Sequence, residues 1–165
     1  MQRYKISLEL VTVFAEKRIF VLFLGSFRNN LYLCGSKTNI AMEQMRVTPE
    51  QITHLEKNEV FVFGSNLAGA HGGGAAWVAY RKFGAVWGQG VGLQGQSYAI
   101  PTMQGGVETI RPYVDECIGV ARQHPELTFL VTRIGCGIAG FTNEEISPLF
   151  AEAHNVPNIV LPLGW

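Results

Sequence analysis

The sequence has little charge, and the charge that it has is balanced. Of its 165 residues, 16% are Asp, Glu, Lys or Arg, with 13 basic residues against 13 acidic ones. A balanced chain lacks the basic face that nucleic-acid binding requires, so we expect no nucleic-acid partner. Hydrophobic residues make up 47% of the chain, which excludes a disordered protein and suffices for the core of one ordinary domain.

Cysteines, metal-ligand motifs and long apolar runs are also scarce. The three cysteines, Cys34, Cys117 and Cys136, have no paired spacing, which argues against a disulfide framework and favours a cytoplasmic location. The apolar run at 19–24 has six residues, far short of the roughly 20 that cross a bilayer, so no membrane partner is expected. Because no histidines or cysteines cluster with ligand spacing, we expect no metal and no cofactor.

Glycine is abundant and unevenly placed. Residues 1–44 hold two of the 19 glycines and carry a net charge of +3, whereas residues 45–165 hold the other seventeen and carry −3. We interpret 1–44 as an N-terminal extension, either added strands or a segment upstream of the domain. Residues 45–165 are then the domain that carries the chemistry.

Short apolar runs alternate with helical patterns along 45–165. Strands are predicted at 59–63, 98–101, 127–132 and 158–162, and helices at 72–83 and 110–121. Strands that are apolar throughout and alternate with helices indicate an α/β fold whose sheet is covered on both faces.

Capping residues predict further helix starts. Thr48 is a candidate N-cap with Pro49 after it, and Ser147 is the predicted N-cap of a final helix. Thr142 and Glu145 have the spacing of a capping box just ahead, in this helix or in a separate turn.

Two glycine-rich loops directly follow predicted strands. The first spans 64–76 and the second spans 135–141. Glycine lets backbone N–H groups approach a ligand closely, and consecutive N–H groups at a helix start bind anions. Two such loops at one edge of a sheet could hold a diphosphate between them, although tight turns and close packing would also require glycine. Neither loop has the context of a dinucleotide fingerprint, and no Gly-Lys-Ser/Thr motif is present.

The residues of these loops resemble those of macrodomains, the ADP-ribose-binding modules. The similarity lies in Phe61–Asn66, in His71–Ala76 and in Thr132–Phe141, and it extends in order and spacing over 58–162. The resemblance, closest to a divergent bacterial branch, implies a three-layer α/β/α sandwich with a mixed sheet. It also implies ADP-ribose or a derivative as the small-molecule partner, free or attached to an ADP-ribosylated protein.

The resemblance assigns candidate ligand-binding residues. Asn66 would contact the distal ribose, and Phe141 would pack on a sugar or base. The glycines of both loops and their neighbours would offer backbone N–H groups: Gly72, Gly73, Gly74, Gly135, Cys136, Gly137, Ile138, Ala139 and Gly140. The aspartate that binds adenine in the family has no counterpart, because the only aspartate is Asp115 in a predicted helix; Glu50 and Glu59 are candidate substitutes.

Few side chains in or near the loops are candidates for a catalytic role. His71 lies inside the first loop and is the candidate catalytic residue for proton transfer; contact with a phosphate, helix capping and backbone hydrogen bonding are the alternatives. Cys136 could act as a nucleophile or merely fit its loop. Arg133 could bind a phosphate through its guanidinium. The glycine-rich segment 88–96 is typical of either a lid or a close backbone crossing.

Three functions remain open. The first is hydrolysis of an ADP-ribose derivative, with water activated by His71 or by the phosphate of the substrate. The second is a reader that binds ADP-ribose without turnover. The third is a Rossmann-like nucleoside-phosphate hydrolase that uses a glutamate.

Overall fold

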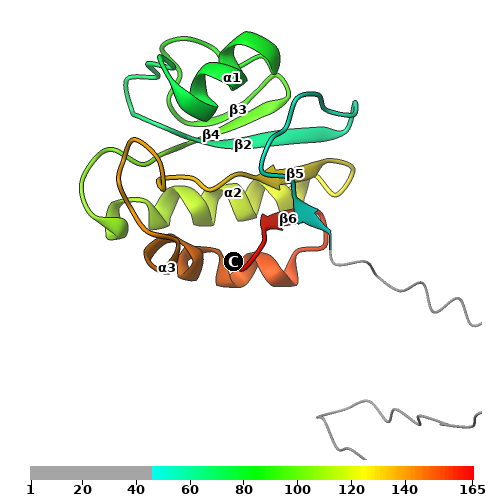
Figure 1. Ribbon diagram of the computed structural model, residues 1–165. Coiled ribbons are helices and arrows are strands. Elements are labelled where there is room, and N and C mark those ends of the chain that lie inside the picture. The colour runs from blue at the N-terminus through cyan, green and yellow to red at the C-terminus, as the bar shows by residue number, and fades with distance from the viewer. Residues whose placement is uncertain (1–45) are drawn as a thin grey trace, which may run out of the picture. The chain divides into compact units, whose positions relative to one another are not determined.

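The computed structural model describes residues 46–165, so the predictions for 1–44 lie outside the described residues. The described chain has an α/β fold with a six-stranded mixed sheet (Figure 1). Along the chain the elements are β1 (Val47–Thr48), β2 (Glu59–Ser65), α1 (Gly74–Lys82), β3 (Gly92–Gln94), β4 (Ser97–Pro101), η1 (Val107–Thr109), α2 (Arg111–Gln123), β5 (Thr128–Val131), α3 (Asn143–Ile146), η2 (Ser147–Asn155) and β6 (Ile159–Pro162). The two η elements are 3₁₀-helices.

Parallel pairing dominates the sheet. The strand order is β1-β6-β5-β2-β4-β3, and only the pair of β3 with β4 is antiparallel. Phe61 of β2 lies opposite Leu130 of β5, and Phe63 lies opposite Ala99 of β4. The carboxyl ends of β2, β4 and β5 therefore meet at one edge of the sheet.

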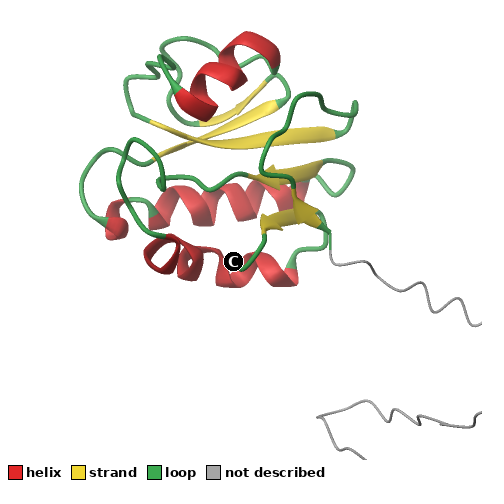
Figure 2. Cartoon of the chain, in the orientation of Figure 1, coloured by secondary structure: helices red, strands yellow, loops and turns green. Residues whose placement is uncertain are grey.

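Helices pack against both faces of β2 because its side chains alternate between the faces. Phe61 and Phe63 pack with Ala76 and Ala79 of α1. Val60 and Val62 belong to a second core with the buried residues of α2 and η2, among them Val114, Ile118, Leu149 and Phe150. Figure 2 shows α1 and α2 on opposite sides of the strands. The strands predicted at 59–63, 98–101, 127–132 and 158–162 are confirmed as β2, β4, β5 and β6, and the helices predicted at 72–83 and 110–121 are confirmed as α1 and α2.

The predicted helix start at Thr48 is wrong. Thr48 lies in β1, beside Pro162 of β6, and its hydroxyl donates to the Val160 carbonyl at 2.7 Å. The hydroxyl therefore joins two strands and does not cap a helix. The segment that follows is not helical, and its Ile52 and Leu55 pack against the core beneath α1.

The final helical segment begins earlier than Ser147. Thr142 and Glu145 form the capping box, with Glu145 N–H donating to Thr142 Oγ1 at 3.3 Å and Thr142 N–H to Glu145 Oε2 at 2.8 Å. The box starts α3, and the chain continues directly into η2 with Pro148 in its first turn. Ser147 is therefore inside the helical segment, and its prediction as N-cap is wrong.

The segment 88–96 crosses close to the backbone at Asn66 and is held there by hydrogen bonds, so it is a close backbone crossing rather than a lid. Gln94 is buried, its side chain accepting from Val86 N–H at 2.6 Å and donating to the Gln89 carbonyl at 3.1 Å. Gly90 is also buried, and a Cβ there would overlap the carbonyl oxygen of Asn66. A side chain larger than hydrogen therefore cannot fit at this crossing.

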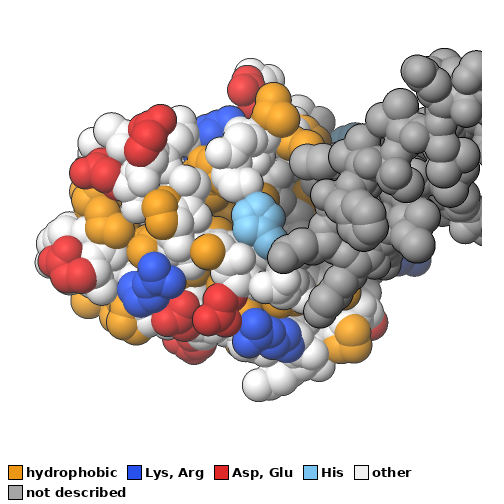
Figure 3. Space-filling view, turned by 90° about the horizontal axis from the view of Figure 1, so that it is seen from below, with side chains coloured by type: hydrophobic (Ala, Val, Ile, Leu, Met, Phe, Trp, Pro, Cys, Tyr) orange, Lys and Arg blue, Asp and Glu red, His pale blue; other side chains and the backbone are white. Residues whose placement is uncertain are grey.

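Acidic side chains are unevenly distributed along the described chain. Figure 3, seen from the side of α2 and η2, shows acidic and basic side chains spread over that face. Residues of α2 and η2 form the ion pairs Arg122–Glu152 at 3.2 Å and Arg111–Asp115 at 3.9 Å. Residues 60–107 contain no acidic side chain, so the first glycine loop lies in a stretch that does not repel anions. Within residues 46–165, no helix is long and apolar enough to cross a membrane.

Two glycine substitutions test this packing in opposite directions. Gly119→Ala, inside α2 with open space around a new Cβ, should raise the free energy of unfolding by about 0.5–1 kcal/mol. Gly90→Ala should lower it by about 1–3 kcal/mol through overlap with the Asn66 carbonyl. Urea denaturation of both variants measures the two changes, and equal effects at both positions would contradict the described crossing.

Candidate functional site

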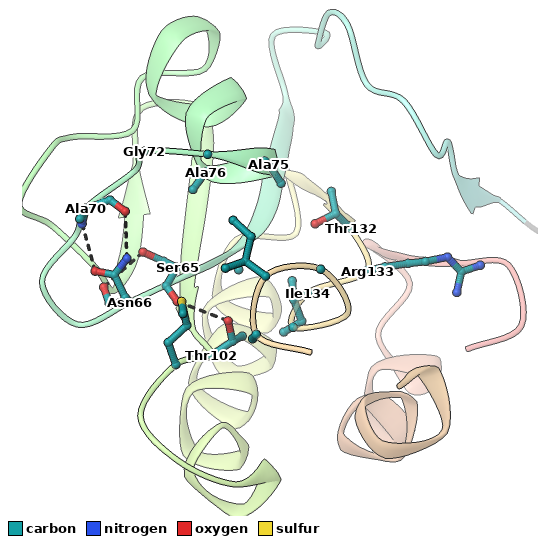
Figure 4. Close-up of a pocket in the computed structure, with 18 residues that line it drawn as sticks. Ser65, Asn66, Ala70, Gly72, Ala75, Ala76, Thr102, Thr132, Arg133 and Ile134 are labelled. Atoms are coloured by element: carbon teal, nitrogen blue, oxygen red, sulfur yellow. Dashed lines mark hydrogen bonds between the residues drawn. The ribbon is translucent and has the colours of Figure 1, made fainter. Parts of the chain in front are cut away.

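A cavity of about 410 Å³ lies at the carboxyl ends of β2, β4 and β5. Its wall is formed by the first loop, by the second loop, and by Thr102 and Met103 after β4 (Figure 4). The two glycine-rich loops therefore meet around one space, because β2 and β5 are parallel neighbours. A volume of this size lies within the range of sites that bind small organic ligands.

Asn66 lines the cavity but also closes its own loop. Its Nδ2 donates to the Ala70 carbonyl at 2.9 Å, and its Oδ1 accepts from the Ala70 N–H at 3.0 Å (Figure 4). Each of these two atoms keeps a further donor or acceptor position, so the amide can still meet a ligand. Its turn sets the path of the chain towards Gly72.

His71 does not line the cavity, which corrects its assignment as the catalytic residue. Its side chain is fully buried, with its ring edge-on to Phe63 and to Trp87. Nε2 lies 3.0 Å from the Val86 carbonyl and 3.2 Å from the Gln89 carbonyl, so it carries the proton and donates to them. Backbone hydrogen bonding, one of the alternatives weighed for this residue, is what the structure has. His71 ties the 86–89 loop to the first glycine loop.

The start of α1 presents a row of free backbone donors. Gly73, the residue before the helix, has extended backbone and no side-chain cap, and Trp77 is the first N–H to bond, to the Gly73 carbonyl at 3.2 Å. The N–H groups from Gly72 to Ala76 have no hydrogen-bond acceptor among residues 46–165. Gly72, Gly73 and Gly74 all line the cavity. This helix start can therefore bind an anion.

The second loop contributes further donors from the opposite wall. Gly135, Gly137, Ile138 and Ala139 line the cavity, and their N–H groups find no acceptor within the described part of the chain. Gly135 has φ of +72°, and a Cβ there would lie 3.1 Å from the Phe141 ring. Only glycine therefore allows this turn to sit against the core.

Three predicted residues of the second loop lie outside the cavity wall. Cys136 N–H bonds the Arg133 carbonyl at 3.3 Å, and Gly140 N–H bonds the Gly137 carbonyl at 3.0 Å. The ring of Phe141 packs against the core beneath the loop, while its N–H bonds the Gly135 carbonyl at 3.0 Å. These residues shape the turn, and the structure does not aim them at a ligand.

The two loops approach each other at Gly73 and Ile138. A Cβ at Gly73 would lie 3.4 Å from the Ile138 side chain, which is 77% exposed at the mouth of the cavity. At the floor, a Cβ on Gly64 would lie 3.3 Å from the Gly135 N atom and 3.3 Å from Thr102 Oγ1. Gly64 was not predicted as a site residue; a glycine inside a strand was the available signal of a close approach.

Among residues 46–165, hydroxyl groups line the cavity, but no histidine, lysine, aspartate or glutamate does. Thr102 Oγ1 donates to the Ser65 carbonyl at 3.3 Å and Thr132 Oγ1 donates to the Val62 carbonyl at 2.9 Å, which leaves both oxygens free to accept. Arg133 is the only charged residue in the wall of this cavity as far as the described residues extend. Its guanidinium extends away from the other lining side chains (Figure 4) and binds Asn143 and the Leu163 carbonyl. The cavity can therefore bind an anion through neutral donors.

A second cavity, of about 610 Å³, shares Thr132 and Arg133 with the first. Prolines 49 and 162 and the side chain of Leu163 give it apolar walls, and Glu50 is its only acidic residue within the described chain. Glu59 does not reach it, since its carboxylate accepts from the Glu56 N–H at 2.9 Å near a different hollow. Of the two candidate substitutes for the adenine-binding aspartate, only Glu50 lies beside the first cavity.

No three His, Cys, Asp or Glu side chains of the described chain gather closely enough to hold a metal ion. Comparisons of the sequence with protein-family models, with curated proteins and with solved structures give no match. The site is therefore interpreted from its own geometry.

The thiol of Cys136 should react slowly. Partial burial raises its pKa above the usual value; Arg133 lowers it, while Glu144 and Glu145 raise it. Because the thiolate is the reactive form, alkylation by iodoacetamide near neutral pH should be slower than that of a free cysteine peptide, rising roughly tenfold per pH unit.

Mass spectrometry of a Cys34→Ser variant follows this reaction, with Cys117 as the internal control. Burial raises the pKa of Cys117 strongly, so it should stay unmodified until the protein unfolds. Alkylation of Cys136 faster than the peptide would restore the nucleophile interpretation.

Proposed function

We propose that the first cavity binds the diphosphate of ADP-ribose or of a related nucleotide diphosphate, without requiring a metal. The observation that carries this proposal is the convergence of free backbone N–H groups from two separate loops on one cavity. The helix start at Gly74 would face one phosphate, and the turn at Gly137–Ala139 would face the other.

The electrostatics of the site support an anionic ligand. The N-terminus of α1 carries the positive end of the helix dipole, and negatively charged ligands are favoured there. No carboxylate of the described residues lines this cavity, so nothing in its wall repels a phosphate. The oxygens of Ser65, Thr102 and Thr132 are available for sugar hydroxyls, which both donate and accept.

The second cavity is the proposed binding site of the nucleotide base. It adjoins the first along the carboxyl edge of the sheet, and its apolar walls suit a flat ring. The Glu50 carboxylate could accept from the exocyclic amino group of adenine. The macrodomain-like three-layer arrangement belongs to this proposal as well; it is supported by α1 on one face and by α2 with η2 on the other.

Binding without turnover is the activity that the geometry supports best. His71 is buried, and no other histidine, lysine or carboxylate of residues 46–165 lines the first cavity. Hydrolysis of an ADP-ribose derivative would therefore need a water activated by the phosphate of the ligand itself. A Rossmann-like hydrolase would need a glutamate at the diphosphate, and Glu50 lies in the second cavity.

Calorimetric titration with ADP-ribose tests the proposal. The wild type should bind ADP-ribose, and Gly73→Val should weaken binding at least roughly 30-fold, about 2 kcal/mol, by filling the gap towards Ile138. Gly73 has φ of −161°, an extended backbone that valine adopts without strain, so the variant should still fold.

Gly119→Ala, remote from the cavity, is the matched glycine control and should bind like the wild type. Mass spectrometry of the mixture, run also with an ADP-ribosylated protein, detects any product and so separates a reader from a hydrolase. Absence of binding to ADP-ribose, ADP and AMP would contradict the proposal and favour the third function.

Glu50→Gln tests the base subsite separately. If Glu50 accepts from adenine, the variant should bind ADP-ribose roughly 3- to 10-fold more weakly, because a charged acceptor becomes a neutral one. Its affinity for ribose 5-phosphate, which lacks a base, should not change. Glu59→Gln is the matched control, and equal losses in both variants would argue against a role for Glu50.

A further inference from the structure

A polar cluster behind the second loop converges on one oxygen atom. Asn143 Oδ1 accepts from Arg133 Nη1 at 2.6 Å and from Trp165 Nε1 at 2.9 Å. The thiol of Cys136 approaches the same atom at 3.8 Å. Two donors from the segment after β5 and one from the C-terminal Trp165 thus meet at a single amide.

The oxygen itself is held in a fixed position. Asn143 is the first residue of α3, directly after the Thr142 capping box. The indole of Trp165 is held in turn by its contact with the Phe150 ring, whose centroid lies 5.3 Å away. Asn143 is exposed, and the capping box with its bonds from Arg133 and Trp165 holds its amide in place.

Arg133 connects this acceptor to the cavity. Its second guanidinium nitrogen, Nη2, donates to the Leu163 carbonyl at 2.8 Å, and it forms no ion pair with a carboxylate of residues 46–165. Its backbone carbonyl accepts from the Cys136 N–H, which closes the turn before Gly137. Side chain and backbone of Arg133 thus fix the second loop where it leaves β5.

We propose that Asn143 is a positioning residue of the binding site: by anchoring Arg133 it holds the second loop so that the N–H groups of Gly137, Ile138 and Ala139 stay directed at the cavity. This inference rests on the proposed function, because it concerns the same donors. Without the Asn143 acceptor, Arg133 Nη1 loses its partner, and the Nη2 bond to the Leu163 carbonyl is left to hold the guanidinium. The turn would then lose the shape that leaves its N–H groups free.

An isosteric pair of variants tests the inference. Asn143→Leu keeps the size of the side chain but removes the acceptor, and it should weaken ADP-ribose binding roughly tenfold or more. Asn143→Asp restores an acceptor, and a carboxylate at a helix start is favourable, so it should recover most of the affinity. Asn155→Leu is the matched control, since Asn155 is exposed and its side chain forms no hydrogen bond in the described chain.

Amide spectra of the ligand-free protein give a readout that does not depend on binding. In Asn143→Leu the ¹⁵N–¹H signals of Gly137, Ile138 and Ala139 should move, and in Asn143→Asp they should stay near their wild-type positions. If the wild type binds no nucleotide, the proposed function fails, and these signals alone decide the role of Asn143. Unmoved signals in Asn143→Leu, or wild-type affinity in that variant, would overturn the inference.

Discussion

The candidate site depends on the parallel pairing of β2 with β5. Parallel strands end at the same edge of a sheet, so the loops that follow them, one running into α1 and the other into α3, must approach each other. The short, apolar strands bury both faces and hold this register. A Cβ on Gly64 would crowd the Gly135 N atom at 3.3 Å, and Gly135 has a positive φ that favours glycine.

The chemistry of the site follows from backbone rather than from side chains. A helix start without a side-chain cap and a turn with positive φ leave N–H groups that find no acceptor among residues 46–165. The hydroxyls and the asparagine amide around them are partly occupied by backbone partners, which holds them in place. Arg133, which is the one cation that the described residues contribute to the wall, is anchored outside the cavity and fixes the shape of the loop.

The sequence predicted the elements whose signal is local. Apolar periodicity located β2, β4, β5, α1 and α2, and the glycine clusters located both loops of the cavity. The sequence-based prediction failed at Thr48 and His71, because the hydrogen-bond partners of these side chains lie far away along the chain. The Thr48 hydroxyl binds the Val160 carbonyl across the sheet, and the His71 ring turns into the core towards residues 86–89. Asn143 accepts hydrogen bonds from residues up to 22 positions away along the chain, and no local pattern marks it.

The most direct measurement is a titration of the ¹⁵N-labelled protein with ADP-ribose, followed at the backbone amides of both loops. If both loops hold the diphosphate, the amide signals of Gly72–Ala76 and of Gly135–Ala139 should shift together, with the same dissociation constant, while the signals of α2 stay in place. Shifts confined to one loop, or two loops that saturate at different ligand concentrations, would contradict a diphosphate held between them.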